Sequence, residues 1–119
     1  MADTALFLGW GSLKSGREKA GFAVFDESVQ FFAGCQQQGR IDSFEPFALE
    51  FHGGELSGFF LLRGDLDKLN QLRYSDDFQR ILDRASNVVN DLGVVTAFTG
   101  NRLQQLFANG QQNTSDIVE

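Results

Sequence analysis

The spacing of apolar residues changes several times along this chain of 119 residues, and the order of the changes constrains the fold more than any other feature. Short continuous runs and alternating stretches predict strands, whereas apolar residues three and four apart predict amphipathic helices. The expected order is strand, helix, strand, strand, helix, strand and a short last helix, at residues 5–10, 16–38, 44–51, 56–63, 66–89, 93–99 and 101–110.

Capping residues indicate where the helices begin and end. Ser15 followed by Glu18 has the spacing of a capping box, and Asp65 and Ser75 are of the types that accept hydrogen bonds at helix N-termini. Ser75 therefore predicts that the helical stretch at 66–89 breaks and starts again. Gly110 is the expected end of the last helix.

The two glycines at 53–54 separate two alternating stretches and predict a hairpin with a two-residue turn. In that register Phe47 lies opposite Phe60 on the face that packs against the helices. Ala48 lies opposite Phe59 on the other face, because strand side chains alternate.

This order of elements predicts an α+β fold of the ferredoxin-like type, βαββαβ with a short C-terminal helix. Its four strands form an antiparallel sheet with the helices on one side. We expect residues 1–110 to form this single domain, and the polar residues 111–119 to form a flexible tail.

Both faces of the expected sheet are apolar. The face turned away from the helices carries Phe44, Ala48, Phe59 and Leu61 in the predicted register. A sheet with one solvated face alternates apolar with polar side chains instead. Burial stabilises by about 25 cal/mol per Å², so leaving these side chains in water forgoes several kcal/mol. We therefore predict a homodimer in which a second copy covers the open sheet face through a two-fold axis.

Charge and composition exclude several classes of protein. With 10 Lys and Arg against 16 Asp and Glu, the net charge of −6 argues against a nucleic-acid partner bound through its phosphates. The single cysteine excludes an internal disulfide, and the one histidine is too thin a ligand set for a metal site. No apolar run is long enough to cross a bilayer and the N-terminus has no basic leader, which predicts a cytoplasmic protein without a membrane partner.

Residues 38–46, 58–60 and 69–78 resemble the YCII-type branch of the dimeric α+β barrel proteins. The shared elements are a Gly-Arg turn leading into a strand, and a helical break before an acidic-aromatic pair. The resemblance implies a homodimeric barrel and a dyad of an Asp with a His on the first helix. Asp77-Phe78, or alternatively Asp76, matches the acid of that dyad. The first helix has no His and the family's proline is absent, so the dyad is not intact.

His52 and Asp77 are the candidate catalytic residues, because an imidazole and a carboxylate can transfer protons. Glu50 lies two residues from His52 on the same face, so a His–carboxylate pair is one hypothesis and a solvated histidine is the other. Arg63 can clamp a carboxylate of a ligand, or it can pair with Glu45 or Glu50.

The glycine-containing loop at 9–16 precedes a helix start and carries Lys14, which is compatible with an anion site. It matches neither the dinucleotide fingerprint nor the Walker pattern. A tight strand-to-helix connection is the simpler interpretation, and no motif in the chain implies a cofactor.

The phenylalanines predict a cavity between the sheet and its helices that suits an apolar or aromatic ligand. The expected lining is Phe22, Phe25, Phe32, Phe47 and Phe60, with Trp10 at the mouth, and Glu50 and Arg63 are the expected polar ligand contacts. Three functions follow as alternatives. They are a homodimeric small-ligand-binding protein, a YCII-like or cofactor-free oxygenase-like enzyme that uses His52 or Asp77, and a non-catalytic dimerisation or regulatory module.

Overall fold

The computed structural model describes residues 3–117 and contains, in this part of the chain, four strands and four helices. They follow the predicted order, with the expected break dividing the second helical stretch into two helices. The elements are β1 (Thr4–Trp10), α1 (Glu18–Gln37), β2 (Ser43–Ala48), β3 (Gly58–Arg63), α2 (Leu66–Arg73), α3 (Asp76–Ser86), β4 (Gly93–Phe98) and α4 (Gly100–Asn113).

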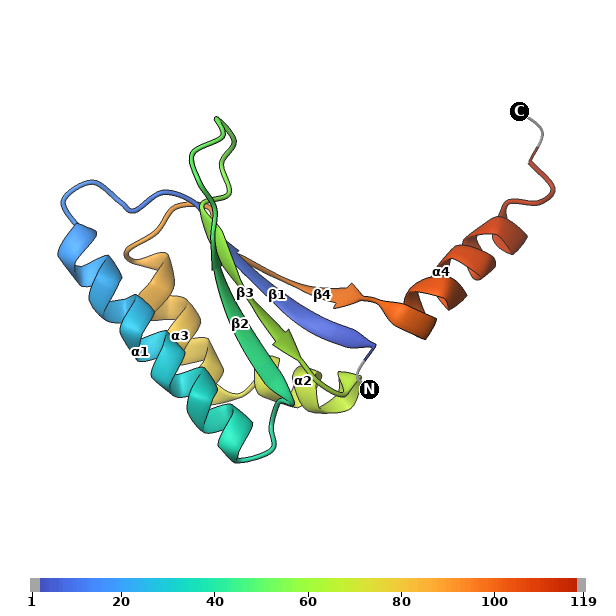
Figure 1. Ribbon diagram of the computed structural model, residues 1–119, viewed down its shortest axis with the longest axis horizontal. Helices are drawn as coiled ribbons and strands as arrows, with labels where there is room; N and C mark the ends of the chain where they lie inside the picture. The colour runs from blue at the N-terminus through green and yellow to red at the C-terminus, as the bar shows by residue number, and fades with distance from the viewer. Residues whose placement is uncertain (1–2, 118–119) are drawn as a thin grey trace.

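The strands form one antiparallel sheet in the order β2-β3-β1-β4, and α1, α2 and α3 lie on one side of it (Figure 1). This is the βαββαβ topology of the ferredoxin-like fold, so the predicted α+β fold class is confirmed. Helices α1 and α3 are joined at the surface by an ion pair, in which Arg84 Nε lies 2.7 Å from Glu27 Oε1.

The core lies between the helices and one face of the sheet. Its strand residues are at most 3% exposed, and they are Leu6 and Leu8 of β1 with Phe60 and Leu62 of β3. The helices complete the core with Phe32 from α1, Leu69 and Leu72 from α2, and Phe78 from α3. Burial of these apolar side chains is the main force that holds the helices on the sheet.

The pairing of β2 with β3 differs by one residue from the predicted register. Phe47 lies opposite Phe59 and Ala48 lies opposite Gly58, because the strands are joined by the longer loop 49–57. The predicted two-residue turn is therefore wrong. Within this loop Gly53 has a positive φ of 83°, but its neighbour at 54 does not, whereas a type I′ turn needs positive φ at both central residues.

This shift moves every side chain of β2 to the other face of the sheet, because strand side chains alternate. Phe44 and Ala48, which were expected on the open face, lie on the helix side. The Phe44 ring is 6.1 Å from the buried Phe32 ring. Phe47, which was expected beside the helices, lies on the open face.

The face of the sheet turned away from the helices is apolar, although its membership differs from the prediction. Phe7, Phe59 and Phe47 stack across β1, β3 and β2, with ring centroids 4.8 and 4.6 Å apart. Leu61 and Val95 share this face, since each pairs with Phe7 in the sheet, and Val95 is 56% exposed. We call these five side chains the open-face patch.

Two of the predicted helix caps are confirmed. The side chains of Asp65 and Ser75 each accept a hydrogen bond at 3.4 Å from the backbone amide three residues further on. The predicted capping box of Ser15 and Glu18 is wrong, because α1 begins at Glu18 and its N-cap makes no side-chain hydrogen bond.

Helix α4 extends away from the sheet and from the other helices, and none of its residues is buried (Figure 1). It continues through Gly110 to Asn113, so the predicted end at Gly110 is wrong and the first part of the predicted tail 111–119 is helical. A helix-interior glycine costs only about 1 kcal/mol, and Gly110 does not take the positive φ of a helix end. Residues 118–119 of that tail lie outside the described residues.

Candidate functional site

A cavity of about 300 Å³ lies between the sheet and the helices α1 and α3. The sheet supplies Leu8, Trp10, Ala48 and Phe60 to its walls. Helix α1 supplies Gly21, Phe22, Val24, Phe25, Ser28 and Phe32, and the remaining lining comes from Leu13, Ile81, Ala85, Val88, Val89 and Leu92. Its walls are almost entirely apolar, which makes it the candidate ligand site of this chain.

Aromatic rings form one wall of the cavity. Trp10, Phe25 and Phe60 contact one another, with ring centroids 5.2 Å apart for Trp10–Phe60, 5.3 Å for Phe25–Phe60 and 6.0 Å for Trp10–Phe25. Phe32 packs edge-on against Phe60 at 5.1 Å and closes the deep end of the cluster. Such a cluster contacts a flat apolar ligand through ring faces and edges.

The position of Trp10 depends on the residue opposite it in the sheet. Trp10 is the last residue of β1 and pairs with Gly58 of β3. A Cβ atom at Gly58 would lie 2.6 Å from Cζ2 of the indole and 2.6 Å from the carbonyl oxygen of Phe47. The absence of a side chain at Gly58 therefore leaves the space in which the Trp10 ring lies against the sheet.

The polar groups that line the cavity are few. Ser28 is 4% exposed, and its hydroxyl donates a 2.8 Å hydrogen bond to the carbonyl oxygen of Val24 in the preceding turn. The Trp10 indole, which also lines the cavity, carries an N–H group that can donate a hydrogen bond. None of the described lining residues is an acid, a base or a thiol, so the cavity favours a neutral molecule.

The structure brings together part of the predicted ligand-binding set. Trp10, Phe25 and Phe60 line the cavity with Phe22 and Phe32. The other three predicted ligand contacts lie elsewhere.

Phe47 lies on the open face because of the shifted β2 register. Glu50 is exposed in the loop 49–57. Arg63, at the end of β3, pairs on the open face with Glu45 at 3.4 Å, which is the ion pair that was one of its two predicted roles.

His52 lies in the loop 49–57, away from the cavity. Its Nδ1 accepts a 3.1 Å hydrogen bond from the Gly54 amide, and its Nε2 lies 2.8 Å from the Leu56 carbonyl oxygen. Because Nδ1 accepts, the proton of the neutral ring is on Nε2, which donates to Leu56. Both ring nitrogens thus bind within the loop, and no hydrogen bond or ion pair joins His52 to Glu50 in the described part of the chain.

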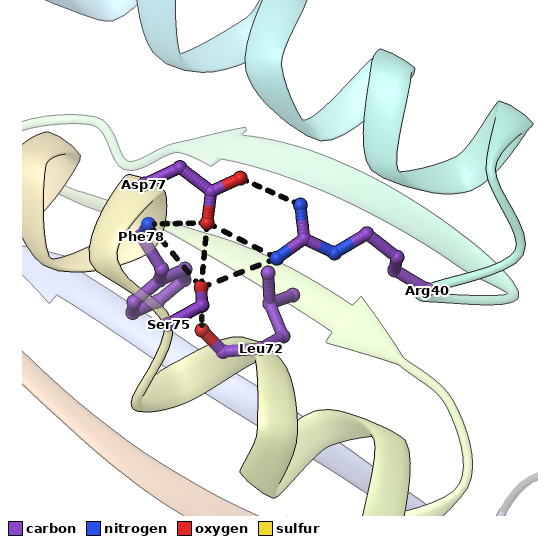
Figure 2. Close-up of polar contacts among 5 residues, drawn as sticks. All are labelled: Arg40, Leu72, Ser75, Asp77 and Phe78. Atoms are coloured by element: carbon purple, nitrogen blue, oxygen red, sulfur yellow. Dashed lines mark hydrogen bonds and ion pairs between the residues drawn. The ribbon is translucent and has the colours of Figure 1, made fainter.

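Asp77 belongs to a polar cluster at the start of α3 (Figure 2). Its carboxylate accepts hydrogen bonds from Arg40, Nη1 to Oδ2 at 2.7 Å and Nη2 to Oδ1 at 3.1 Å. Oδ1 also accepts from the Phe78 amide at 2.9 Å and lies 2.6 Å from the hydroxyl of Ser75. The side-chain hydrogen bond from Arg40, followed by that from Ser75, holds the pKa of Asp77 well below its usual range.

This cluster links two connections of the fold rather than forming a ligand site. Arg40 follows α1, whereas Ser75 and Asp77 lie where α2 gives way to α3. The Ser75 hydroxyl is also 2.6 Å from the Leu72 carbonyl oxygen, which ties the end of α2 to the same network (Figure 2). Asp77 therefore has an arginine as its charged partner, and it does not line the cavity.

The loop between β1 and α1 is occupied by structural contacts. Lys14 donates from Nζ to the Ser86 carbonyl oxygen at 2.9 Å, and Leu13 forms an isolated bridge with Val89. This arrangement agrees with a tight connection between strand and helix. Among residues 3–117, no group of three or more His, Cys, Asp or Glu side chains is placed to hold a metal ion.

The sequence interpretation missed the second half of the cavity wall. Ile81, Ala85 and Val88 face the cavity from α3 and the turn that follows it, and Leu13 faces it from the loop after β1. The spacing of four and three from Ile81 through Ala85 to Val88 is a detectable signal, because residues so spaced share one helix face. The apolar spacing predicted this helix face from the sequence. A pattern within one element, however, does not show which other elements enclose a cavity together with it.

No protein-family model matches this chain, and no curated protein matches it. Among solved structures it is similar to a conserved protein from Methanosarcina mazei Go1, with 12% identity and a TM-score of 0.61 over 83% of this chain and 95% of that one. It is also similar to a dimeric protein of unknown function and ferredoxin-like fold from Bacteroides fragilis NCTC 9343, with 8% identity and a TM-score of 0.59 over 80% and 95% of the two chains.

A third similar structure is SnoaB, a cofactor-independent oxygenase from Streptomyces nogalater, with 19% identity and a TM-score of 0.53 over 83% and 97% of the two chains. At these identities the likeness is one of fold. The chain has a ferredoxin-like α+β fold, shared with proteins that include a described dimer and a cofactor-independent oxygenase.

Proposed function

We propose that this protein is a homodimeric α+β barrel that binds a small apolar or aromatic molecule in the cavity between its sheet and the helices α1 and α3. The observation that carries the proposal is the cavity itself, about 300 Å³ with a lining in which Ser28 is the one hydroxyl side chain among the described residues. The cavity opens to solvent beside the exposed rings of Phe22 and Phe25, and a concave apolar space of this size is typical of small-molecule sites.

The lining indicates the chemistry of the ligand. A charged group in this cavity would lose its hydration and find no opposite charge among the described lining residues. A neutral, flat molecule of one or two rings would lie against Trp10, Phe25 and Phe60. The volume is at the lower end of the range of roughly 300–1,000 Å³ for small-molecule sites, which favours such a small ligand.

The homodimer is supported by the open-face patch, because five apolar side chains on one sheet face are more stable when a second copy covers them. The Bacteroides fragilis protein of similar fold is described as dimeric, which agrees with this proposal. The relation to the YCII-type proteins stays a prediction from the sequence.

A catalytic function that uses His52 or Asp77 has less support. His52 holds the loop 49–57 and Asp77 is paired with Arg40, so neither faces the cavity. The similarity of fold to SnoaB leaves a cofactor-free oxygenase as the alternative, in which the substrate would have to supply its own reactive group. A purely structural dimerisation module is also less favoured, because the space between sheet and helices is not filled.

Binding of naphthalene, a neutral two-ring probe, tests the proposed site. Trp10 is the single tryptophan of the chain, so its fluorescence reports on the cavity directly. We expect saturable binding in calorimetry with a matching change in tryptophan emission. Ala85→Leu, which places a larger side chain in the cavity, should weaken binding by about ten-fold or more, since the added methylenes occupy the ligand's volume.

Ala23→Leu is the matched control, because Ala23 is exposed on α1 and does not line this cavity. It should bind the probe as the wild type does. Equal affinity of the wild type and Ala85→Leu, with both variants folded by circular dichroism, would place binding outside the cavity and contradict the proposal.

A further inference from the structure

Helix α4 has an apolar side that residues 3–117 leave largely uncovered. Leu106 and Phe107 follow Leu103 by three and four residues, so the three side chains lie on one face of the helix. Leu103 is 36% exposed and Phe107 is 67% exposed, and no residue of the helix is buried. We call these three side chains the α4 row.

The composition of α4 does not support a helix that stands alone in water. It has 14 residues, includes Gly100 and Gly110, and has no side-chain hydrogen bond at its N-cap. Isolated helices of fewer than about 12–15 residues are marginal even when rich in alanine, and an interior glycine costs about 1 kcal/mol more. Its stability must therefore come from packing against another surface.

The size of the molecule also indicates a missing contact. The accessible surface is 7889 Å², whereas a compact monomer of 13.2 kDa exposes about 6,400 Å². The radius of gyration is 16.7 Å, against about 13.5 Å for a compact domain of this length. The excess surface of about 1,500 Å² is enough for a protein interface, since a standard one takes about 800 Å² from each partner.

We propose that α4 is a docking arm whose row of Leu103, Leu106 and Phe107 packs on a second copy of this chain, at the rim of the partner subunit's open sheet face. The inference rests on the homodimer proposed above and assigns a second part to its interface. In a dimer with a two-fold axis, the α4 of each subunit packs on the other subunit. Both arms are then used within the dimer, so the contact does not build a filament.

The area needed for a stable dimer supports this occupant. Four strands of about six residues present roughly 400 Å² on one face, from the spacing of about 4.8 Å between strands and the rise of about 3.3 Å per residue. That is about half of the 800 Å² that a standard interface takes from each partner. An arm of 14 residues covers roughly 200 Å² on the partner subunit. The surface on which the partner's arm packs adds about the same area, so each subunit reaches the roughly 800 Å² of a standard interface.

The chemistry of α4 also matches a second copy. Arg102 is the one charged residue in the helix sequence, whose polar positions are otherwise Asn and Gln, and interfaces are depleted of charge in this way. The open-face patch is likewise apolar, and the nearby charges of Arg63 and Glu45 neutralise each other. The arm leaves the body directly after β4, the edge strand that carries Val95 of this patch.

Hydrogen exchange of the α4 amides, measured together with sedimentation equilibrium, tests the arm on the full-length protein. We expect protection of the amides at 103–110 when the protein is dimeric, and loss of that protection on dilution to the monomer. Phe107→Glu should reduce the protection by about ten-fold or more and weaken the dimer, because it places a charge in an apolar contact. Gln105→Glu adds the same charge on the opposite side of α4 and should leave both measurements unchanged.

Each result decides between the dimer and the arm. A stable dimer whose α4 amides exchange as in an unfolded peptide would overturn the arm and leave the homodimer standing. A monomer with protected α4 amides would show that the helix docks on its own chain, and it would overturn both the arm and the homodimer. Equal effects of Phe107→Glu and Gln105→Glu would show that the apolar row is not the contact.

Discussion

The carboxylate of Asp77 connects the segment after α1 with the start of α3. It accepts two hydrogen bonds from Arg40 beyond α1 and one from the first turn of α3, beside Ser75, which caps that helix. A carboxylate at a helix N-terminus is also stabilised by the helix dipole. At the residue scale, then, Asp77 acts on stability, and the low pKa that these contacts produce makes the effect dependent on pH.

Asp77→Asn should reduce the free energy of unfolding at pH 7 by about 1 kcal/mol, the scale of a half-exposed ion pair with a helix cap. The pKa of Asp77 is lower in the folded state than in the unfolded chain, so its contribution is complete above the unfolded pKa of about 3.9 and is lost as the pH falls toward the folded value. The difference between variant and wild type should therefore shrink below about pH 4.

Urea denaturation at neutral and acidic pH measures both effects. Asp83→Asn is the control, because Asp83 also lies on α3 and makes no ion pair within residues 3–117. A loss of stability in Asp77→Asn that is the same at both pH values would contradict the role of the charge.

At the scale of elements, the loop 49–57 decides how the sheet is built. It is closed by the backbone hydrogen bond from the Leu49 amide to the Ser57 carbonyl oxygen at 2.9 Å and by the two contacts of the His52 ring. This loop sets the register of β2, and the register determines which of its side chains face the helices. His52, which the sequence indicated as a candidate catalytic residue, thus makes hydrogen bonds that hold the conformation of this loop.

His52→Ala should loosen the loop and leave the cavity intact. We expect faster hydrogen exchange at the Gly54 amide, a change of less than about 1 kcal/mol in unfolding free energy, and unchanged affinity for naphthalene. Phe51→Ala is a useful comparison, because Phe51 is 97% exposed in the same loop and the hydrogen bonds of the His52 ring go to Gly54 and Leu56. If His52→Ala lost naphthalene binding and Phe51→Ala did not, His52 would be a part of the binding site, contrary to this prediction.

At the scale of the whole molecule, the helices α1, α2 and α3 lie on one side of the sheet (Figure 1). The other side carries the apolar side chains of the open-face patch. The helix side contains the core and the cavity, and it is complete within one chain. The open-face patch is complete only if another surface covers it. The proposed dimer and the proposed ligand site therefore lie on opposite faces of the same sheet.

Val95→Glu should convert the dimer to a monomer without unfolding the chain. Val95 is 56% exposed, so the charge is tolerated in the monomer, whereas in the dimer it would be buried in an apolar contact. We expect an increase of about 100-fold or more in the dimer dissociation constant by sedimentation equilibrium, with unchanged circular dichroism. Ala23→Glu adds the same charge on the exposed side of α1, and this control variant should remain dimeric. A wild-type protein that is monomeric at about 10 μM would refute the proposed interface.

Short-range signals accounted for much of the fold. The caps at Asp65 and Ser75 and the order of elements were predictable because each depends on residues within one or two helical turns or along one strand. The aromatic wall of the cavity at Trp10, Phe25 and Phe60 was identified from the same patterns, since each lies on the apolar side of its own element.

Contacts between distant segments required the tertiary structure. Positions 44, 46 and 48 of β2 are apolar, and so is position 47, so alternation did not distinguish the two faces, and the loop 49–57 selected one register. Arg40 became the partner of Asp77 only when α1 and α3 were packed side by side. The direction in which α4 leaves the sheet was likewise decided by the turn at Thr99 and Gly100, where Gly100 has a φ of 58°. A local pattern reports which side chains need burial, whereas the packing of whole elements determines what buries them.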